Sequence, residues 1–177
     1  MSMMTHKSSA GLDAGPANGP RLLLADHHRE LEVACSALLA TVDEGCPRML
    51  TKQYRVFERA VIDHMAAEDT IILPGFEGHA PAEAHALGLE HAAIRKLLLQ
   101  LGIEVELHLV RLETVKHLID TLHAHAARED AWMYPWAQVY LPLSARRQLF
   151  VRIGRSLRML AALRARVTAP PPPPLTR

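Results

Sequence analysis

The sequence is short of cysteine and of aromatic residues, and each shortage excludes a class of protein. Its two cysteines, Cys35 and Cys46, match no zinc-binding spacing and no disulfide framework, so we expect a reducing compartment. Aromatic residues make up only 5% of the chain while leucine and alanine are abundant, which favours helices over strands. No segment alternates apolar and polar residues with the period of a half-buried strand. We therefore expect an all-α protein.

Long apolar runs and a signal peptide are also missing. No apolar run approaches the roughly 20 residues that a membrane-spanning helix needs. Residues 1–20 are polar and rich in Gly, Ser and Pro, without the apolar core of a secretory signal. We expect these residues to form a disordered leader, and we expect the protein to be soluble and cytoplasmic.

Acidic residues are absent from the end of the chain. All nineteen precede Leu143, whereas eight of the twenty basic residues, all of them arginines, follow it. Between residues 141 and 168, leucine, isoleucine and valine recur at helical spacing among these arginines. This pattern predicts a basic amphipathic helix that packs along the bundle or joins two copies in a homodimer, and we favour these roles over binding to nucleic acid or a membrane. Residues 169–177 form a Pro-rich tail.

The chain between the leader and this basic helix contains four further helical segments. Gly45 and Pro47 separate the first two, Pro74-Gly75 ends the second, and Gly102 ends the third. The predicted segments cover residues 22–44, 47–73, 81–101 and 106–134, the last disturbed at its end by Pro135. Because the links are short, we predict an antiparallel up-down-up-down four-helix bundle over residues 21–140, with an additional C-terminal helix.

An internal repeat places the same residue types twice in the chain. His64-Met65-Ala66-Ala67-Glu68-Asp69 precedes Pro74, and His125-Ala126-Ala127-Arg128-Glu129-Asp130 precedes Pro135. His, Glu, Asp and Pro fall at identical offsets in the two copies. The doubled pattern predicts two equivalent helices with equivalent tasks.

The helix before each of these copies carries a further histidine. Glu90-His91 precedes Ile94, and Asp26-His27-His28 precedes Leu31. His27 and His28 are adjacent and cannot both point at one site. His28 is displaced from its apolar stripe in the same sense as His91, whereas His27 is displaced in the opposite sense, so we favour His28 over His27.

The spacing within each copy brings metal-binding groups to one face of a helix. Residues four apart lie one turn apart, so His64 can point with Glu68, and His125 with Glu129, toward one spot. A single His-x-x-x-Glu is usually a surface ion pair. Here both copies lie in phase with apolar stripes, where facing carboxylates would repel each other without a cation between them. Imidazoles and carboxylates together suit iron, manganese or zinc.

These motifs resemble the hemerythrin family, specifically its HHE cation-binding branch, over about residues 22–138. The resemblance implies an antiparallel four-helix bundle with a non-haem centre of two iron ions bridged by carboxylates. It also implies a ligand set in which two glutamates bridge the ions. The implied ligands are His28 (or His27), His64, Glu68, His91, His125 and Glu129.

The sequence departs from the oxygen-carrying hemerythrins at two positions. Leu87 stands where those proteins have a further histidine, and the repeat favours Glu129 over Asp130 as the bridging residue. The resemblance is therefore to the four-His, two-Glu variants found in iron–sulfur repair and iron-sensing members. One histidine fewer leaves an additional open coordination position, which suits redox chemistry or small-ligand sensing.

The expected function is a binding or sensing protein rather than an enzyme, with oxygen, nitric oxide or peroxide as the ligand. The alternatives are iron–sulfur cluster repair or peroxide reduction by the same centre, and metal storage or a scaffold that uses manganese or zinc. Asp69 and Asp130 either hold ligand histidines or are exposed, and Trp132 and Trp136 are expected to pack in the core or at its end. The remaining histidines without repeat partners are expected at the surface: His79, His85, His108, His117 and His123.

Overall fold

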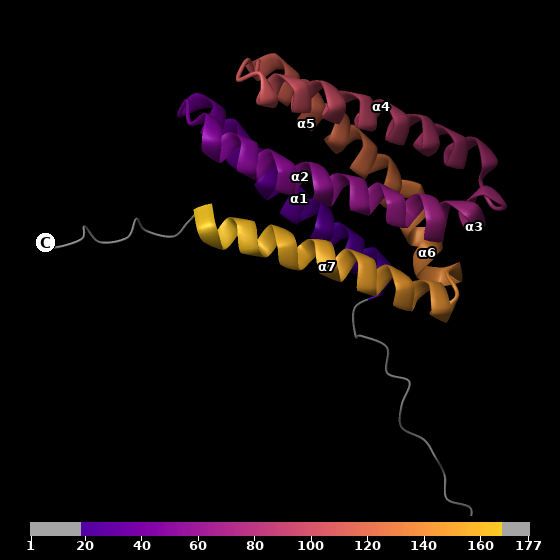
Figure 1. The fold of residues 1–177 in the computed structure, drawn as a ribbon. Coiled ribbons are helices and arrows are strands. Elements are labelled where there is room, and N and C mark those ends of the chain that lie inside the picture. Colours follow the sequence, from indigo (N-terminus) through magenta and orange to yellow (C-terminus); the bar gives the residue numbers. More distant parts are fainter. Residues whose placement is uncertain (1–18, 168–177) are drawn as a thin grey trace, which may run out of the picture.

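The computed structural model describes residues 19–167, and every element in this part of the chain is helical (Figure 1). The predicted Pro-rich tail and the first eighteen residues of the predicted leader lie outside the described residues. The elements are α1 (Pro20–Asp43), α2 (Pro47–Ala67), η1 (Glu68–Ile72), α3 (Leu73–Glu77), α4 (Pro81–Glu106), α5 (Leu112–Arg128), η2 (Glu129–Met133), α6 (Tyr134–Tyr140) and α7 (Leu143–Val167). The segments η1 and η2 are single turns of π-helix.

The first four long helices form the predicted four-helix bundle. Helix α1 packs against α2 and α5, and α4 packs against the same two helices, so the four elements close into a ring of neighbours. Tight links join them; the first contains Gly45, whose positive φ of 64° suits a residue just past a helix end. The all-α bundle predicted from the sequence is confirmed.

Helix α7 is the additional C-terminal helix, and it lies alongside α1 and α2 on the outside of the bundle (Figure 1). Its apolar stripe of Leu149, Ile153 and Leu160 is buried against them. Arg164 at the outer edge pairs with Glu30 of α1 at 2.9 Å. The arginine-rich composition of this helix therefore coexists with an apolar face that the bundle covers. Among the helices that the structure describes, none is long and apolar enough to cross a membrane.

The core of the bundle consists of two apolar clusters with a polar layer between them. On α1, Leu24 belongs to one cluster and Leu31 to the other. On α4, Leu87 and Ile94 divide in the same way. On both helices the predicted ligand histidine lies between these two positions. The apolar residues on either side therefore hold the helices together while a band of polar side chains crosses the interior.

The prediction that the second helix stops at Pro74-Gly75 is wrong, as is the prediction that the fourth helix ends near Tyr134. Both helices continue beyond their proline through a π turn, to Glu77 and to Tyr140. In these turns the N–H of Leu73 reaches back to the carbonyl of Glu68 five residues earlier, and Tyr134 does the same with Glu129. Proline cannot donate the regular helical hydrogen bond. The wider turn just before it changes the bonding pattern and lets the helix go on.

The boundaries of the third and fourth helices also differ from the prediction. Helix α4 continues through Gly102 to Glu106, and α5 begins only at Leu112. Gly102 lies against Tyr54 of α2, where an added Cβ would come 3.1 Å from the phenol oxygen. The Tyr54 hydroxyl also donates a hydrogen bond to the carbonyl of Leu98, which lies on α4 one turn before Gly102. The glycine at this position allows two helices to approach closely and does not mark a helix end.

Candidate metal centre

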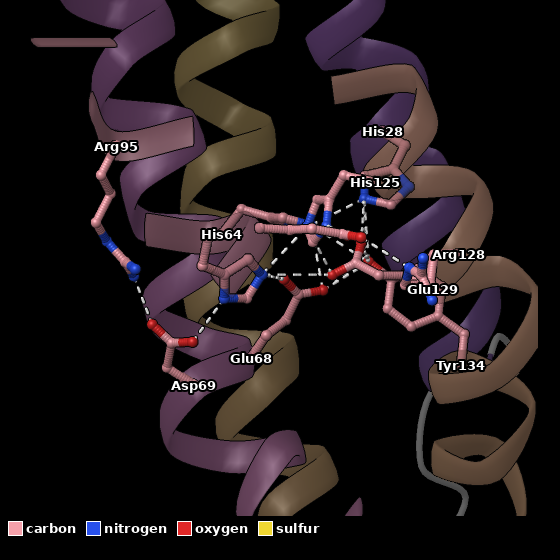
Figure 2. A network of polar contacts seen from close by, with 11 residues as sticks. His28, His64, Glu68, Asp69, Arg95, His125, Arg128, Glu129 and Tyr134 are labelled. Carbon is pink, nitrogen blue, oxygen red and sulfur yellow. Dashed lines mark hydrogen bonds and ion pairs between the residues drawn. The ribbon is translucent and has the colours of Figure 1, made fainter. Parts of the chain in front are cut away.

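The predicted ligand positions converge in the polar layer, with His28 rather than His27 among them (Figure 2). Their donor atoms form two groups in which all atoms lie within 4.8 Å of one another. Glu68 and Glu129 belong to both groups. The first group is His28, His64, Glu68 and Glu129, and the second is Glu68, His91, His125 and Glu129. We call these the His28–His64 half-site and the His91–His125 half-site.

The two shared glutamates have no exposed surface. Burial and the charge of Glu129 raise the pKa of Glu68 to about 7. Burial also acts to raise the pKa of Glu129, but hydrogen bonds from His125 and His28 outweigh it and lower this pKa well below its usual value. Two carboxylates facing each other in a closed interior need positive charge between or beside them. Glu68 Oε2 and Glu129 Oε1 are also buried and face imidazoles, with Glu68 Oε2 at 3.5 Å from His91 Nε2 and Glu129 Oε1 at 3.0 Å from His125 Nε2.

The His91–His125 half-site has its imidazoles held from behind by carboxylates. His91 Nδ1 lies 2.6 Å from Asp69 Oδ1, and His125 Nδ1 lies 2.8 Å from Glu90 Oε2. Each Nδ1 therefore donates its proton outward, which leaves the Nε2 lone pair of a neutral ring facing the centre. The two Nε2 atoms are 3.1 Å apart. Only protons or a metal cation can separate so many acceptor atoms.

In the absence of a metal, protons meet this need. Burial lowers the pKa of His91, but hydrogen bonds to Glu129 and Glu68 outweigh burial and raise this pKa to about 10. The pKa of His28 and that of His125 are also raised, because the hydrogen bond and charge of Glu129 exceed the opposing effect of burial. The cluster is therefore a site where cations and protons compete for the same lone pairs.

Arginines hold the outer carboxylates of the His91–His125 half-site in place. Asp69 also accepts a hydrogen bond from Arg95 (Figure 2). Glu90 accepts one from Arg128 at 2.7 Å, and Arg128 in turn pairs with Glu83 at 2.8 Å. Such chains from ligand to carboxylate to arginine fix the tautomer and the direction of a ligand imidazole.

Among residues 19–167, no such carboxylates support the His28–His64 half-site. In this part of the chain, the buried Nδ1 atoms of His28 and His64 have no hydrogen-bond partner. Their Nε2 atoms lie 2.9 Å apart and face the glutamates, with His28 Nε2 at 3.2 Å from Glu129 and His64 Nε2 at 3.2 Å from Glu68. The donor atoms that face the centre are therefore arranged alike in the two half-sites. The groups behind the imidazoles differ, because only the His91–His125 half-site has carboxylates there.

The structural arrangement agrees with a comparison against family models. The model of the hemerythrin HHE cation-binding domain matches residues 20–137, which is well over half of the chain. The chain belongs to the hemerythrin HHE cation-binding family. Searches of curated proteins and of solved structures return no match. The hemerythrin-like region thus covers the four bundle helices and both half-sites, and α7 follows it.

Tyr134 is a member of the hemerythrin-like centre that the sequence analysis did not single out. Its hydroxyl lies 2.6 Å from Glu68 Oε1, 2.9 Å from Glu129 Oε2 and 3.0 Å from His28 Nε2 (Figure 2). Burial and the two glutamate charges raise its pKa well above the usual value, so the phenol keeps its proton. The repeat offered a signal for this residue: Tyr134 precedes Pro135 at the position where the first copy has Leu73 before Pro74, so the two copies differ there by a hydroxyl-bearing side chain.

The two π turns explain how Tyr134 reaches the centre. Each begins at one of the shared glutamates. In a regular α-helix, residues five apart are rotated by about 140° relative to each other. The wider turn reduces this rotation, so the side chain of Tyr134 can lie over that of Glu129. Single π turns of this kind often occur at functional sites.

His27 is completely buried, but it supplies no donor atom to either half-site. Its Nε2 lies 2.7 Å from Ser156 Oγ. Burial, together with the neighbouring His28, lowers the pKa of His27 to about 3, so the ring is neutral. The geometry thus separates the adjacent histidines as the helical phase predicted, with His28 in the cluster and His27 outside it.

The other predicted positions divide between the centre and the surface. Asp69 supports a ligand histidine, whereas its repeat counterpart Asp130 is exposed. Trp132 is 58% exposed, so its predicted packing role is wrong, while Trp136 packs against Phe76 at the end of the bundle. The histidines predicted at the surface are all exposed: His79, His85, His108, His117 and His123.

A cavity of about 550 Å³ leads from the surface to the centre between α1, α2 and α5. His28, His64 and His125 form part of its wall. The remaining lining includes apolar Val61 and Leu122 and the exposed charged residues Arg29, Glu32 and Asp130. The cavity therefore connects the surface with His28 and His64 of one half-site and with His125 of the other.

Proposed function

We propose that this hemerythrin-family protein holds two iron ions and binds or senses a small ligand such as oxygen, nitric oxide or peroxide. The observation that carries the proposal is the pair of four-residue donor groups that share Glu68 and Glu129. In it, His28 and His64 would hold one ion, His91 and His125 the other, and the two glutamates would bridge them.

The chemistry of the donors fits a metal pair. The buried oxygens of Glu68 and Glu129 that face the imidazoles, and the inward lone pairs of those imidazoles, are groups that a divalent cation would satisfy. A pair of iron ions supplies redox-active centres with coordination positions left free for an exogenous ligand. Leu87, where oxygen carriers have a histidine, is completely buried in an apolar cluster and supplies no donor.

The cavity supports an uncharged ligand. Its charged lining residues are exposed, whereas buried Leu31, Val61 and Met65 line it further in, so a diatomic molecule would enter more readily than an ion that loses its hydration there. It reaches both histidines of the His28–His64 half-site. We therefore place the ligand-accessible side of the centre at this half-site.

A second candidate, peroxide reduction, is favoured by Tyr134. Reduction of peroxide consumes protons, and Tyr134 holds a proton within 2.9 Å of both bridging carboxylates. This phenol is placed to hold or deliver a proton at the His28–His64 half-site, where the cavity ends.

The experiment that tests the proposal begins with metal analysis of protein purified from cells grown with iron. We expect close to two iron ions per chain and an optical spectrum of an oxidised carboxylate-bridged pair. The reduced protein is then mixed with oxygen, nitric oxide or peroxide. A stable coloured adduct supports binding, and consumption over many turnovers supports catalysis. Iron well below one per chain contradicts both iron functions and leaves manganese or zinc as the metal.

A further inference from the structure

The two halves of the repeat use different residues to support their second histidine. In each half, a residue directly before the helix-borne ligand lies behind the histidine of the neighbouring helix. In the second half this residue is Glu90, which accepts a hydrogen bond from His125. In the first half the equivalent residue is His27, and it lies against His64.

His27 contacts His64 through the face of its ring. The two rings are stacked with centroids 4.7 Å apart and planes only 2° from parallel. His64 Nδ1 has no hydrogen-bond partner among the described residues. The stack with His27 therefore takes the place of the hydrogen bond that orients His91 and His125 from behind.

Ser156 in turn forms a hydrogen bond with the His27 ring. Its hydroxyl lies 2.7 Å from His27 Nε2, and both side chains are buried, at 1% and 0% exposed. Ser156 belongs to α7, 129 residues away along the chain. It lies between the buried Ile153 and Leu160 on the face that α7 packs against the bundle. The contact is thus held within a packed interface.

We propose that Ser156 is a positioning residue for the metal ion of the His28–His64 half-site and acts through His27. The direction of a ligand lone pair follows from the plane of its imidazole, and a ring without a hydrogen bond at Nδ1 depends on packing to fix that plane. This inference rests on the proposed function, since it assigns a support to one of the two proposed ions. It also gives α7 a task in metal binding beyond covering α1 and α2.

The test measures iron release from the full-length protein. Protein loaded anaerobically with ferrous iron is mixed with a coloured ferrous chelator, and release is followed with time. The wild type is expected to release its two ions in two phases, because the half-sites differ in their supports. Ser156→Ala should accelerate one phase by roughly tenfold and leave the other unchanged.

Two matched variants assign the phases. Ser144→Ala changes an exposed serine of the same helix and should leave both phases as in the wild type. Asp69→Asn, which alters the support of His91, should accelerate the phase that Ser156→Ala does not. If Ser156→Ala accelerates both phases equally, or neither, the inference is overturned.

Substitutions of His27 separate ring positioning from general packing. His27→Phe keeps a flat ring against His64, whereas His27→Leu removes it. We expect release from the affected phase to be slower in His27→Phe than in His27→Leu, with both proteins folded by circular dichroism. Equal release rates in these two variants contradict the role of the stack. A wild-type protein that binds no metal contradicts the proposed function instead, so the two failures are distinguishable.

Discussion

The His91–His125 half-site and the His28–His64 half-site present the same inward donors but are held by different means. The His91–His125 half-site relies on charged chains that run from imidazole to carboxylate to arginine. The second relies on a neutral stack and a serine, and it borders the cavity. The two halves of the repeat thus share the donor residues that face the centre, while the residues behind these donors differ. If the centre holds two ions as proposed, the charged half would hold its ion more tightly and the neutral half would hold the exchangeable ion.

The largest expected effect comes from removing a residue that both halves share. Glu68→Ala or Glu129→Ala should abolish binding of the metal pair, because each carboxylate belongs to both donor groups. Metal content per chain is the measurement, with Glu77→Ala, an exposed glutamate of α3, as the control. Two ions per chain in either variant would contradict the bridging roles.

Substitutions of the residues behind the histidines should affect one half-site and spare the other. Asp69→Asn should weaken binding of one ion by roughly ten- to a hundredfold, because it removes the carboxylate that orients His91. Asp130→Asn is the matched control, since this repeat counterpart is exposed and makes no hydrogen bond to a ligand histidine in the described structure. Stepwise titration of the apoprotein with ferrous or cobaltous ion gives the two affinities. Equal effects of the two substitutions would show that the halves are supported alike.

The protonation of the cluster predicts how metal affinity depends on pH. Because its pKa is raised to about 10, His91 is protonated on both ring nitrogens at pH 7 when no metal is bound. Glu68, with a pKa of about 7, is half protonated at this pH. Metal binding must displace these protons, so affinity should rise with pH from 6 to 8. Calorimetry in buffers of different ionisation enthalpy measures the protons released. An affinity that is constant over this range would contradict the competition.

The smallest expected effect is that of Tyr134→Phe. The ring remains in the core, and only the hydroxyl shared by Glu68 and Glu129 is lost, so two ions should still bind. The metal-free protein should be destabilised by about 1–3 kcal/mol, the cost of leaving buried acceptors without a donor. Urea unfolding of the apoprotein measures this, with Tyr140→Phe at an exposed position as the control. Loss of an ion in Tyr134→Phe would instead make the phenol a ligand.

The residues of the two donor groups could be predicted from the sequence because both of their determinants are local. Four-residue spacing sets His64 with Glu68 and His125 with Glu129, and helical phase distinguishes His28 from His27. The four-helix bundle could be predicted from the helical spacing of apolar residues and from the break at Gly45 and Pro47. These features need no knowledge of which helices are neighbours.

The remaining features depend on tertiary contacts or on the π turns that precede Pro74 and Pro135. Proline reads as a helix end, so the π turns were missed, and with them the approach of Tyr134 to Glu129. Glu90 sits beside a predicted ligand, but only the packing of α4 on α5 shows that it serves His125. Ser156 and His27 are 129 residues apart in the sequence, and no sequence pattern predicts their contact.

The order of the supports along the chain has a consequence for biosynthesis. Every residue that steadies His91 and His125 lies between positions 69 and 128, whereas the serine behind His27 comes only at position 156. A chain emerging from the ribosome therefore completes the charged half before the neutral one. Maturation of the centre would be stepwise, with the second ion secured only when the last helix docks.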